Sequence, residues 1–278
     1  MSTRTRILSD SNITFMDVIR WAITVIVSVI VFLPVLYAFS VSLRPRSEVF
    51  GPVHLIPYEP TIEPYLSFFA DSSTYLVNSL LVATGVSMLI LLIAIPGAYA
   101  FGRLEFKGRK GLFYAIVMIV LVPEVMLIVP VAQIVRWLHL FDTIAGLWLA
   151  LLIGGMPIAI WILRDNFMRL PPNAEEAAMV YGCTQFSAFR KVVLPLATPA
   201  IITVAFLSFL SAWTEFLFTN MLSTPGGGWT AIVVLFSLMN PDHSPNWPLL
   251  MAASFIVSLP PIVFYGLIRR TLQEALNF

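Results

Sequence analysis

Thiol groups are almost absent from this chain of 278 residues, because Cys183 is its only cysteine. A single cysteine can form neither an intrachain disulfide nor a cluster of thiolate ligands around a metal ion. The three histidines, His54, His139 and His243, lie far apart in the sequence and show no ligand spacing. The sequence therefore predicts no metal site.

Charged residues are scarce as well. Asp, Glu, Lys and Arg together make up only 11% of the chain, and the formal net charge is +1. No basic stripe with interleaved aromatic residues is present, and such a stripe is typical of proteins that bind nucleic acids. We therefore expect no nucleic-acid partner.

Sets of catalytic residues are also missing. The sequence has no nucleophile elbow and no paired carboxylates at catalytic spacing. The three glycines at 226–228 lack the Lys and Ser or Thr that complete a phosphate-binding loop, so they predict a flexible turn. We expect a chain that is not an enzyme and that binds no cofactor, ATP included.

What the chain has in abundance is apolar sequence: 59% of its residues are hydrophobic and the mean hydropathy is +0.89. A helix needs about 20 apolar residues to cross the hydrocarbon core of a bilayer. Six runs are long enough, and together they predict an all-helical, polytopic membrane protein with six transmembrane helices. The runs are Val18 to Leu43, Leu76 to Phe101, Leu112 to Val135, Ile144 to Leu163, Ala200 to Leu222 and Leu249 to Ile268.

The distribution of basic residues orients these six spans. With the N-terminus in the cytoplasm, thirteen of the sixteen Lys and Arg residues fall on the cytoplasmic side. Only Arg44, Arg46 and Arg136 remain outside, whereas the reverse orientation would invert the ratio. The sequence therefore predicts that both termini are cytoplasmic.

The largest cytoplasmic segment, residues 164–199, is far too short for a nucleotide-binding domain, which needs about 100 residues or more. Its residues predict two short helices. Pro171 and Pro172 end the preceding span, and Asn173 is expected to cap a helix that Gly182 ends in a left-handed conformation. A second helix is expected from Thr184 to Leu194, the residue before a proline.

One pattern in this segment fixes several residue identities over twenty positions. Glu176-Ala177-Ala178 is followed by Gly182 and then by Val192, Leu194 and Pro195. All the spacings match the EAA signature of permease subunits of ATP-binding-cassette (ABC) importers, with Val192 in place of the usual isoleucine. The resemblance implies that segment 164–199 is the coupling loop, which docks on an ATPase subunit. It assigns coupling roles to Glu176, Ala177, Ala178, Gly182, Val192, Leu194 and Pro195.

Other stretches extend the resemblance to the carbohydrate-uptake branch of that family, where the chain is similar to the smaller permease subunit of maltose-type systems. They are Asn78-Ser79-Leu80, Ala98-Tyr99-Ala100-Phe101-Gly102-Arg103, Pro123, Pro130, Asp142-Thr143, Trp213, Glu215 and Phe216. The chain departs from the branch at Tyr181, where aspartate is usual, and at Cys183, where alanine is usual.

This resemblance implies a type I ABC importer (MetI-like) permease fold, with residues 1–278 forming one transmembrane domain in a prokaryotic inner membrane. The implied partners are membrane lipid, a second homologous permease subunit, two ATP-binding subunits that use ATP and Mg, and an extracytoplasmic solute-binding protein. The implied function is ATP-driven import of a sugar or related polyol by alternating access.

Two carboxylates lie inside expected spans, Glu124 and Glu215, where an exposed charge would cost about 2.5–3.5 kcal/mol. With Trp213 they are candidates for the solute path, although helix-to-helix packing explains buried carboxylates equally well. Two other functions remain open. One is an importer permease for an amino acid, phosphonate or glycerol phosphate, and the other is a secondary transporter in which the two carboxylates relay protons.

Overall fold

The computed structural model describes residues 15–49, 51, 54–239 and 245–276, and all regular structure within these ranges is helical. Four helices are long and apolar enough to span a membrane: α1 (Phe15–Ser42), α2 (Glu63–Arg103), α5 (Ile144–Arg169) and α12 (Trp247–Leu276). Two bent pairs raise the number to six if each pair is one span. The all-helical, polytopic prediction is confirmed.

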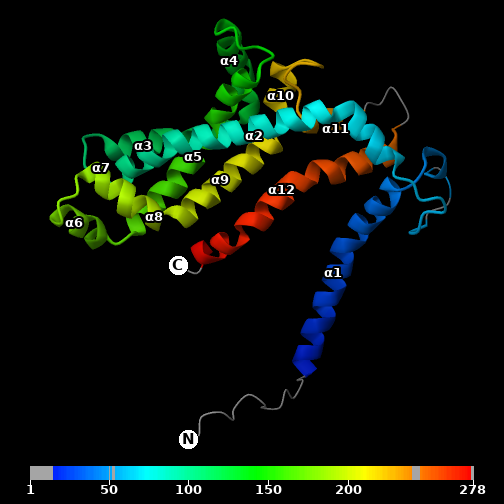
Figure 1. Ribbon diagram of the computed structural model, residues 1–278, viewed down its shortest axis with the longest axis horizontal. Coiled ribbons are helices and arrows are strands. Elements are labelled where there is room, and N and C mark those ends of the chain that lie inside the picture. Colours follow the sequence, from blue (N-terminus) through cyan, green and yellow to red (C-terminus); the bar gives the residue numbers. More distant parts are fainter. Residues whose placement is uncertain (1–14, 50, 52–53, 240–244, 277–278) are drawn as a thin grey trace, which may run out of the picture.

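Helix α2 is the central element of the body, and α5, α9 (Thr198–Trp213) and α12 pack around it (Figure 1). It has 41 residues and begins thirteen residues before the run expected from hydropathy. The added residues are more polar, but they include the fully buried Phe68. Packing therefore extends this helix beyond its apolar run.

Close approach between α2 and α5 depends on glycine at several points. A Cβ atom on Gly85 would lie 2.2 Å from the indole ring of Trp148, and one on Gly155 would lie 2.5 Å from Ile90. The Trp148 Nε1–H group also donates a hydrogen bond to the Leu81 carbonyl at 3.0 Å. These two helices therefore form a closely packed unit.

The third expected span, 112–135, is not one straight helix. The first part is α3 (Arg109–Met118) with the short turn η2 (Ile119–Leu121), and the second part is α4 (Glu124–Trp137). The direction of the chain bends by 104° between the two parts. Val122 adopts an extended backbone before Pro123, whose ring disfavours helical geometry in the preceding residue. The run expected to form the third span is therefore a bent pair of helices, with the break at Pro123.

The fifth expected span, 200–222, is also broken. Helix α9 ends at Trp213, residues 214–216 interrupt it, and α10 (Leu217–Leu222) follows. At its other end α9 meets the segment Gln185–Leu196 at an angle of 73°. The apolar run therefore contains one long helix and one short helix rather than a single span.

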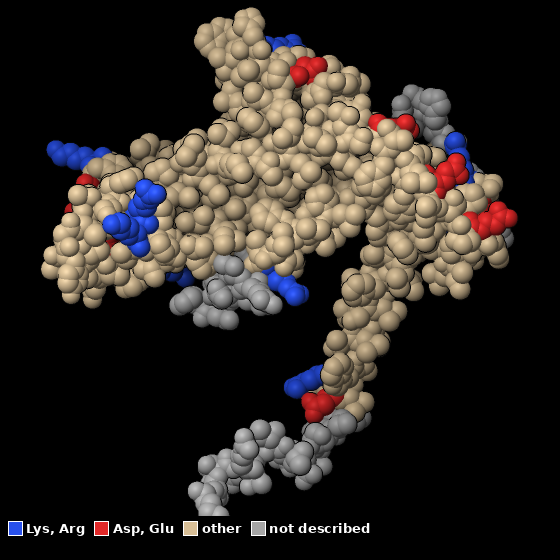
Figure 2. All heavy atoms as spheres, viewed as in Figure 1, with Lys and Arg blue, Asp and Glu red and all other residues tan. Residues whose placement is uncertain are grey.

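Helix α1 projects away from the body (Figure 1), and the apolar window that qualifies it as a span has no buried residue. Its last turns contact α12, where the rings of Phe39 and Phe255 lie 5.4 Å apart edge to face. On the face drawn in Figure 2, charged side chains gather toward the ends of the body and leave its middle nearly free of charge. This distribution suits a membrane protein.

The body has two ends that differ in sequence and contacts. The hairpin end contains the last turn of α2 and residues 170–197, which include α6 (Pro172–Val180), α7 (Gln185–Ala188) and α8 (Leu194–Leu196). The opposite end contains the 43–62 loop, residues 138–143 and residues 223–230, which precede α11 (Ala231–Ser237).

Candidate functional site

The 170–197 hairpin begins where Pro171 and Pro172 end α5, as expected. Its first helix, α6, ends at Gly182, whose φ of 90° confirms the expected left-handed conformation. The Gly182 N–H donates to the Met179 carbonyl and the Cys183 N–H to the Ala178 carbonyl, both at 3.0 Å. These paired bonds form a Schellman motif and fix the bend of the hairpin.

The expected cap of the first hairpin helix was wrong. Residue Pro171 occupies the N-cap position and Pro172 is the first helical residue, so Asn173 lies within the helix rather than at its cap. Proline suits the first helical position because the N–H it lacks would have no partner there. The second helix begins after Thr184, as expected, and the Thr184 hydroxyl oxygen caps it by accepting a bond from the Ser187 N–H at 3.3 Å.

The second helix of the hairpin does not stop at Leu194. It widens into a π-helical turn, η3 (Phe189–Val193), and continues as α8, which contains Pro195. In a regular α-helix the proline ring would collide with the carbonyl four residues before it. The wider turn changes that register, so the chain passes through the proline.

One face of the hairpin is exposed and largely apolar. Val180, Tyr181 and Phe186 are 85%, 89% and 73% exposed, and Glu176 and Ala177 are exposed beside them. The remaining expected coupling residues vary, with Gly182 and Pro195 exposed and Ala178, Val192 and Leu194 half-buried. Exposed apolar patches of this kind mark interaction surfaces.

The other face of the hairpin presents Glu175 to the body. This side chain is buried, and the Tyr99 hydroxyl donates a hydrogen bond to its Oε1 atom. Its Oε2 atom lies 3.9 Å from Nε of Arg103, and the Arg103 guanidinium donates to the Leu170 carbonyl at 2.6 Å. The carboxylate thus joins α6 to the last turn of α2 and to the end of α5.

Aromatic packing surrounds this polar cluster. The Tyr99 ring lies 4.5 Å from the ring of Phe189 and 6.1 Å from that of Phe167, measured between centroids. Ala188 beside them is fully buried. Sequence reasoning missed Tyr99, Arg103 and Glu175 as a group, although the first two stand four residues apart and so share a helix face.

A second candidate region lies between α5 and α9. A cavity of about 220 Å³ is lined by small and apolar residues that include Gly154, Gly155 and Ala159 on α5 and Ser208 and Ser211 on α9. A Cβ atom on Gly154 would lie 3.8 Å from Oε1 of Glu124. The carboxylate at the start of α4 therefore lies close to the lining of this cavity.

The other expected solute-path residues are placed differently. Glu215 accepts three hydrogen bonds within the first turn of α10, from the Phe218 N–H at 2.7 Å, the Thr219 N–H at 3.0 Å and the Thr219 hydroxyl at 2.9 Å. Trp213 is buried, and its indole N–H donates to the Val257 carbonyl of α12 at 3.1 Å. Both side chains have structural partners, and their place on a solute path stays a prediction.

At the opposite end, Asp142 holds two loops together. Its carboxylate accepts bonds from the Thr224 N–H at 2.7 Å, the Thr224 hydroxyl at 2.6 Å and the Gly228 N–H at 3.1 Å. Burial alone would raise the pKa of Asp142, but the three hydrogen bonds outweigh it and lower the pKa. Asn78 of α2 also donates to the Gly227 and Trp229 carbonyls, both at 3.0 Å.

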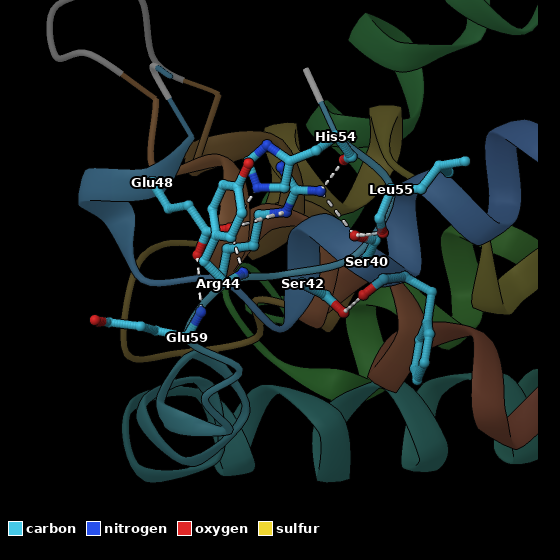
Figure 3. A network of polar contacts seen from close by, with 9 residues as sticks. Ser40, Ser42, Arg44, Glu48, His54, Leu55 and Glu59 are labelled. Carbon is cyan, nitrogen blue, oxygen red and sulfur yellow. Dashed lines mark hydrogen bonds and ion pairs between the residues drawn. The ribbon is translucent and has the colours of Figure 1, made fainter. Parts of the chain in front are cut away.

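A second polar network closes the loop after α1 (Figure 3). The buried Arg44 guanidinium donates to the Ser40 hydroxyl at 2.8 Å and to the His54 carbonyl, and it lies 4.0 Å from Glu48. The Glu48 carboxylate lies 2.6 Å from His54 Nε2, and hydrogen bonds from His54 and from the Tyr58 N–H lower its pKa. Within the described residues, no three His, Cys, Asp or Glu side chains are grouped to hold a metal.

Comparison with known proteins identifies the family of this chain. A family model described as a binding-protein-dependent transport system inner membrane component matches residues 90–276. The chain is 34% identical to a trehalose transport system permease protein of Mycobacterium tuberculosis, over 88% of this chain and 90% of that protein. It is 29% identical to a diacetylchitobiose uptake system permease protein of Streptomyces coelicolor, over 88% and 89% of the two chains.

Among solved structures, the chain is similar to one from a bacterial ABC transporter that imports the acidic polysaccharide alginate. The TM-score is 0.78 at 19% identity, and the match covers 95% of this chain and 98% of the other. At this identity the likeness concerns the fold, which is shared over nearly the whole length.

Proposed function

This chain belongs to the family of binding-protein-dependent transport system inner membrane components, and we propose that the solute it helps to import is a sugar or related polyol. The chain is the permease component of an ABC importer, a multi-pass protein of the inner membrane. Curated relatives support a carbohydrate solute, because their names include trehalose, diacetylchitobiose and maltose.

We also propose that the 170–197 hairpin docks on an ATP-binding subunit, because its exposed apolar face adjoins the Glu176-Ala177-Ala178 signature. Such a face, with Val180 and Tyr181 almost fully exposed, suits a groove on an ATP-binding subunit. In this assignment residues 1–278 are one permease domain and residues 164–199 are its coupling loop. The complete importer would contain a second permease subunit, two ATP-binding subunits and an extracytoplasmic solute-binding protein.

The mechanism follows from this arrangement. When ATP brings the two ATP-binding subunits together, the hairpins that dock on them move as well. That motion would tilt the helices bound to the hairpin and open the membrane cavity to the outside, where the binding protein delivers solute. After hydrolysis the cavity would open to the cytoplasm. ATP and Mg act on the partner subunit, and this chain performs the mechanical step.

The transport assay is direct. The chain is reconstituted in proteoliposomes with its permease partner, ATP-binding subunits and binding protein, and uptake of radiolabelled trehalose, maltose and diacetylchitobiose is measured with ATP supplied. We expect ATP-dependent uptake of at least one sugar, and none when the ATP-binding subunit is catalytically inactive. Uptake of an amino acid or a phosphonate instead would refute the assignment of solute class.

The solute path is proposed to follow the cavity between α5 and α9, with Glu124 and Glu215 at one end of it. The charges of these two carboxylates are close enough to interact. We expect Glu215→Gln, which keeps the size of the side chain, to preserve assembly and to change uptake kinetics or sugar preference. If Glu215→Leu abolishes assembly while Glu215→Gln transports normally, Glu215 only caps α10 and does not contact solute.

We also propose that both termini and the hairpin are cytoplasmic. Cysteines at Glu59 and Pro225, both exposed at the opposite end, should react with an impermeant thiol reagent in intact cells. A cysteine at the exposed Gln185 of the hairpin should not react, with Cys183→Ser as background. Reaction at Gln185 without reaction at Glu59 would reverse the orientation.

A further inference from the structure

We infer that the two adjacent glutamates of the hairpin have separate tasks, and that Glu175, through Tyr99 and Arg103, transmits hairpin motion to α2. The inference rests on the proposed function, because it names the residues that carry the mechanical step. Glu176 is exposed and faces away from the body, whereas Glu175 is buried against α2. The glutamate of the signature therefore docks, and its neighbour transmits.

The geometry of α2 supports this role. Tyr99 and Arg103 stand four residues apart in the last turn of α2, so their side chains point from one face. Both reach the same carboxylate, Tyr99 at Oε1 and Arg103 at Oε2 of Glu175. The Tyr99 hydrogen bond fixes one carboxylate oxygen, and the 3.9 Å ion pair with Arg103 adds electrostatic attraction at the other.

The cluster also spans both halves of the hairpin. Tyr99 donates to Glu175 in α6, and its ring packs on Phe189 in the π-helical turn. Arg103 donates to the Leu170 carbonyl, at the point where α5 leads into the hairpin. A displacement of either half therefore pulls on the same turn of α2.

Close packing of Gly102, in the same turn of α2, holds this turn against α5. A Cβ atom on Gly102 would lie 3.3 Å from the Arg164 carbonyl and 3.4 Å from Cβ of Phe167, so α2 and α5 touch backbone to backbone here. From this turn α2 continues as one helix, with Pro96 inside it, to the opposite end, where Asn78 holds the 227–229 segment. A push on the hairpin is thereby connected to the far loops through one continuous helix.

The charges make the connection specific. Burying a carboxylate is costly unless a cation or hydrogen-bond donors compensate it, and here Arg103 and Tyr99 supply both. Separating the hairpin from α2 would break the Tyr99 hydrogen bond and the Arg103 ion pair of Glu175 together. The pair therefore favours motion of hairpin and α2 as one body, and opposes motion of the hairpin alone.

Spin-label distances test the inference without any knowledge of the solute. Labels on Lys191 of the hairpin and Leu92 of α2, both exposed, are placed in the whole complex with Cys183→Ser as background. In the wild type we expect one narrow distance distribution that is the same without nucleotide and after trapping with ATP and vanadate. In Glu175→Gln and Tyr99→Phe we expect the distribution to broaden or shift on trapping.

Uptake and retention of the ATP-binding subunits should respond differently to changes at Glu175 and Glu176. Glu175→Gln should retain the ATP-binding subunits and hydrolyse ATP, while trehalose uptake falls about tenfold, the loss expected for one charge-assisted hydrogen bond. Glu176→Gln, the matched control, should weaken retention of the ATP-binding subunits and leave the Lys191–Leu92 distance narrow. The exchanged pair Glu175→Arg with Arg103→Glu should recover part of the uptake that either single change removes.

An unchanged narrow distance in Glu175→Gln, with unchanged coupling of hydrolysis to uptake, would overturn the inference. A wild-type complex that carries no sugar would refute the proposed solute class but leave the distance measurement intact. Loss of the ATP-binding subunits from Glu175→Gln but not from Glu176→Gln would reverse the two tasks and also overturn the inference.

Discussion

The hairpin end and the opposite end of this subunit differ in how they treat their side chains. At the opposite end, Asp142 binds the 223–230 segment, while Arg44 and Glu48 hold the 43–62 loop to the end of α1 and to itself. At the hairpin end, large apolar side chains such as Tyr181 and Phe186 are left exposed. Apolar exposure is common to both ends, because Ile56 and Tyr58 of the 43–62 loop are 80% and 75% exposed. The ends differ in that buried or hydrogen-bonded charges fix the loops of the opposite end, whereas the exposed face of the hairpin adjoins the signature that predicts an ATP-binding partner.

The largest expected effect tests the interface. Glu176→Lys should leave the subunit in the membrane but reduce retention of the ATP-binding subunits roughly 100-fold. By the family resemblance Glu176 pairs with a basic group of the ATP-binding subunit, and two like charges at an interface cost several kcal/mol. Co-purification from membranes measures the effect. Glu59→Lys makes the same charge change at an exposed site of the opposite end and should have no effect. Equal retention in both variants would contradict the comparison.

The next effect tests the fixed loops of the opposite end. Asp142→Ala removes the acceptor of three hydrogen bonds and should lower the free energy of unfolding by about 1–3 kcal/mol, measured by denaturation in detergent. Asp165, in the last turns of α5 before the hairpin, is the matched control, because its 2.7 Å ion pair with Arg169 is exposed and such surface pairs contribute about 0–1 kcal/mol. A larger loss for Asp165→Ala would reverse the order.

A smaller effect separates two neighbouring glycines. A Cβ atom on Gly227 would lie 2.3 Å from both carboxylate oxygens of Asp142, whereas one on Gly226 would meet nothing within 4 Å. Gly226 has a φ of 88°, so alanine there costs about 1 kcal/mol of backbone strain. Gly227→Ala should instead displace the Asp142 carboxylate. In a double-mutant cycle, the loss of unfolding free energy caused by Asp142→Ala should then disappear in the Gly227→Ala background and persist in the Gly226→Ala background.

The smallest effect is a dependence on pH. The pKa values of Glu48 and Asp142 are lowered in the folded protein, so unfolding takes up protons once the pH falls toward their ordinary values. Their contribution is complete above pH of about 4–5 and is lost as the pH falls through the folded pKa. Hydrogen-exchange protection factors, corrected for the slower intrinsic exchange at low pH, should therefore fall on acidification around Glu48 and Tyr58 and in segment 222–230. Glu48→Gln with Asp142→Asn should remove most of this response.

Sequence patterns predicted much of this fold because membrane insertion is decided by local composition. The runs at α1, α5 and α12 became single helices, and Gly182 ended α6 in the expected conformation. The angle at Pro123 was not predictable, because proline permits a break and the packing of distant helices sets its size. The alternative of a gradient-driven secondary transporter fell with the family assignment.

The site was only partly readable for a similar reason. Motif spacing located the hairpin and its turn, but spacing does not say how far a helix is rotated about its axis. Rotation decides that Glu175 faces Tyr99 while Glu176 faces outward, and it depends on contacts with α2 that are 76 positions apart in sequence. The same uncertainty affected Trp213, which packs on α12.

The bend at Pro123 has a consequence for the surrounding bilayer. Each arm of the bent pair is about 20 Å long at 1.5 Å per residue. The second arm turns 104° away from the direction of the first, so the ends of the pair are only about 25 Å apart. A hydrocarbon core is about 30 Å thick, so crossing on this element creates hydrophobic mismatch. If the pair crosses the bilayer as one span, the lipid tails beside it are compressed. Host membranes with shorter acyl chains should accommodate this flank of the importer at lower cost.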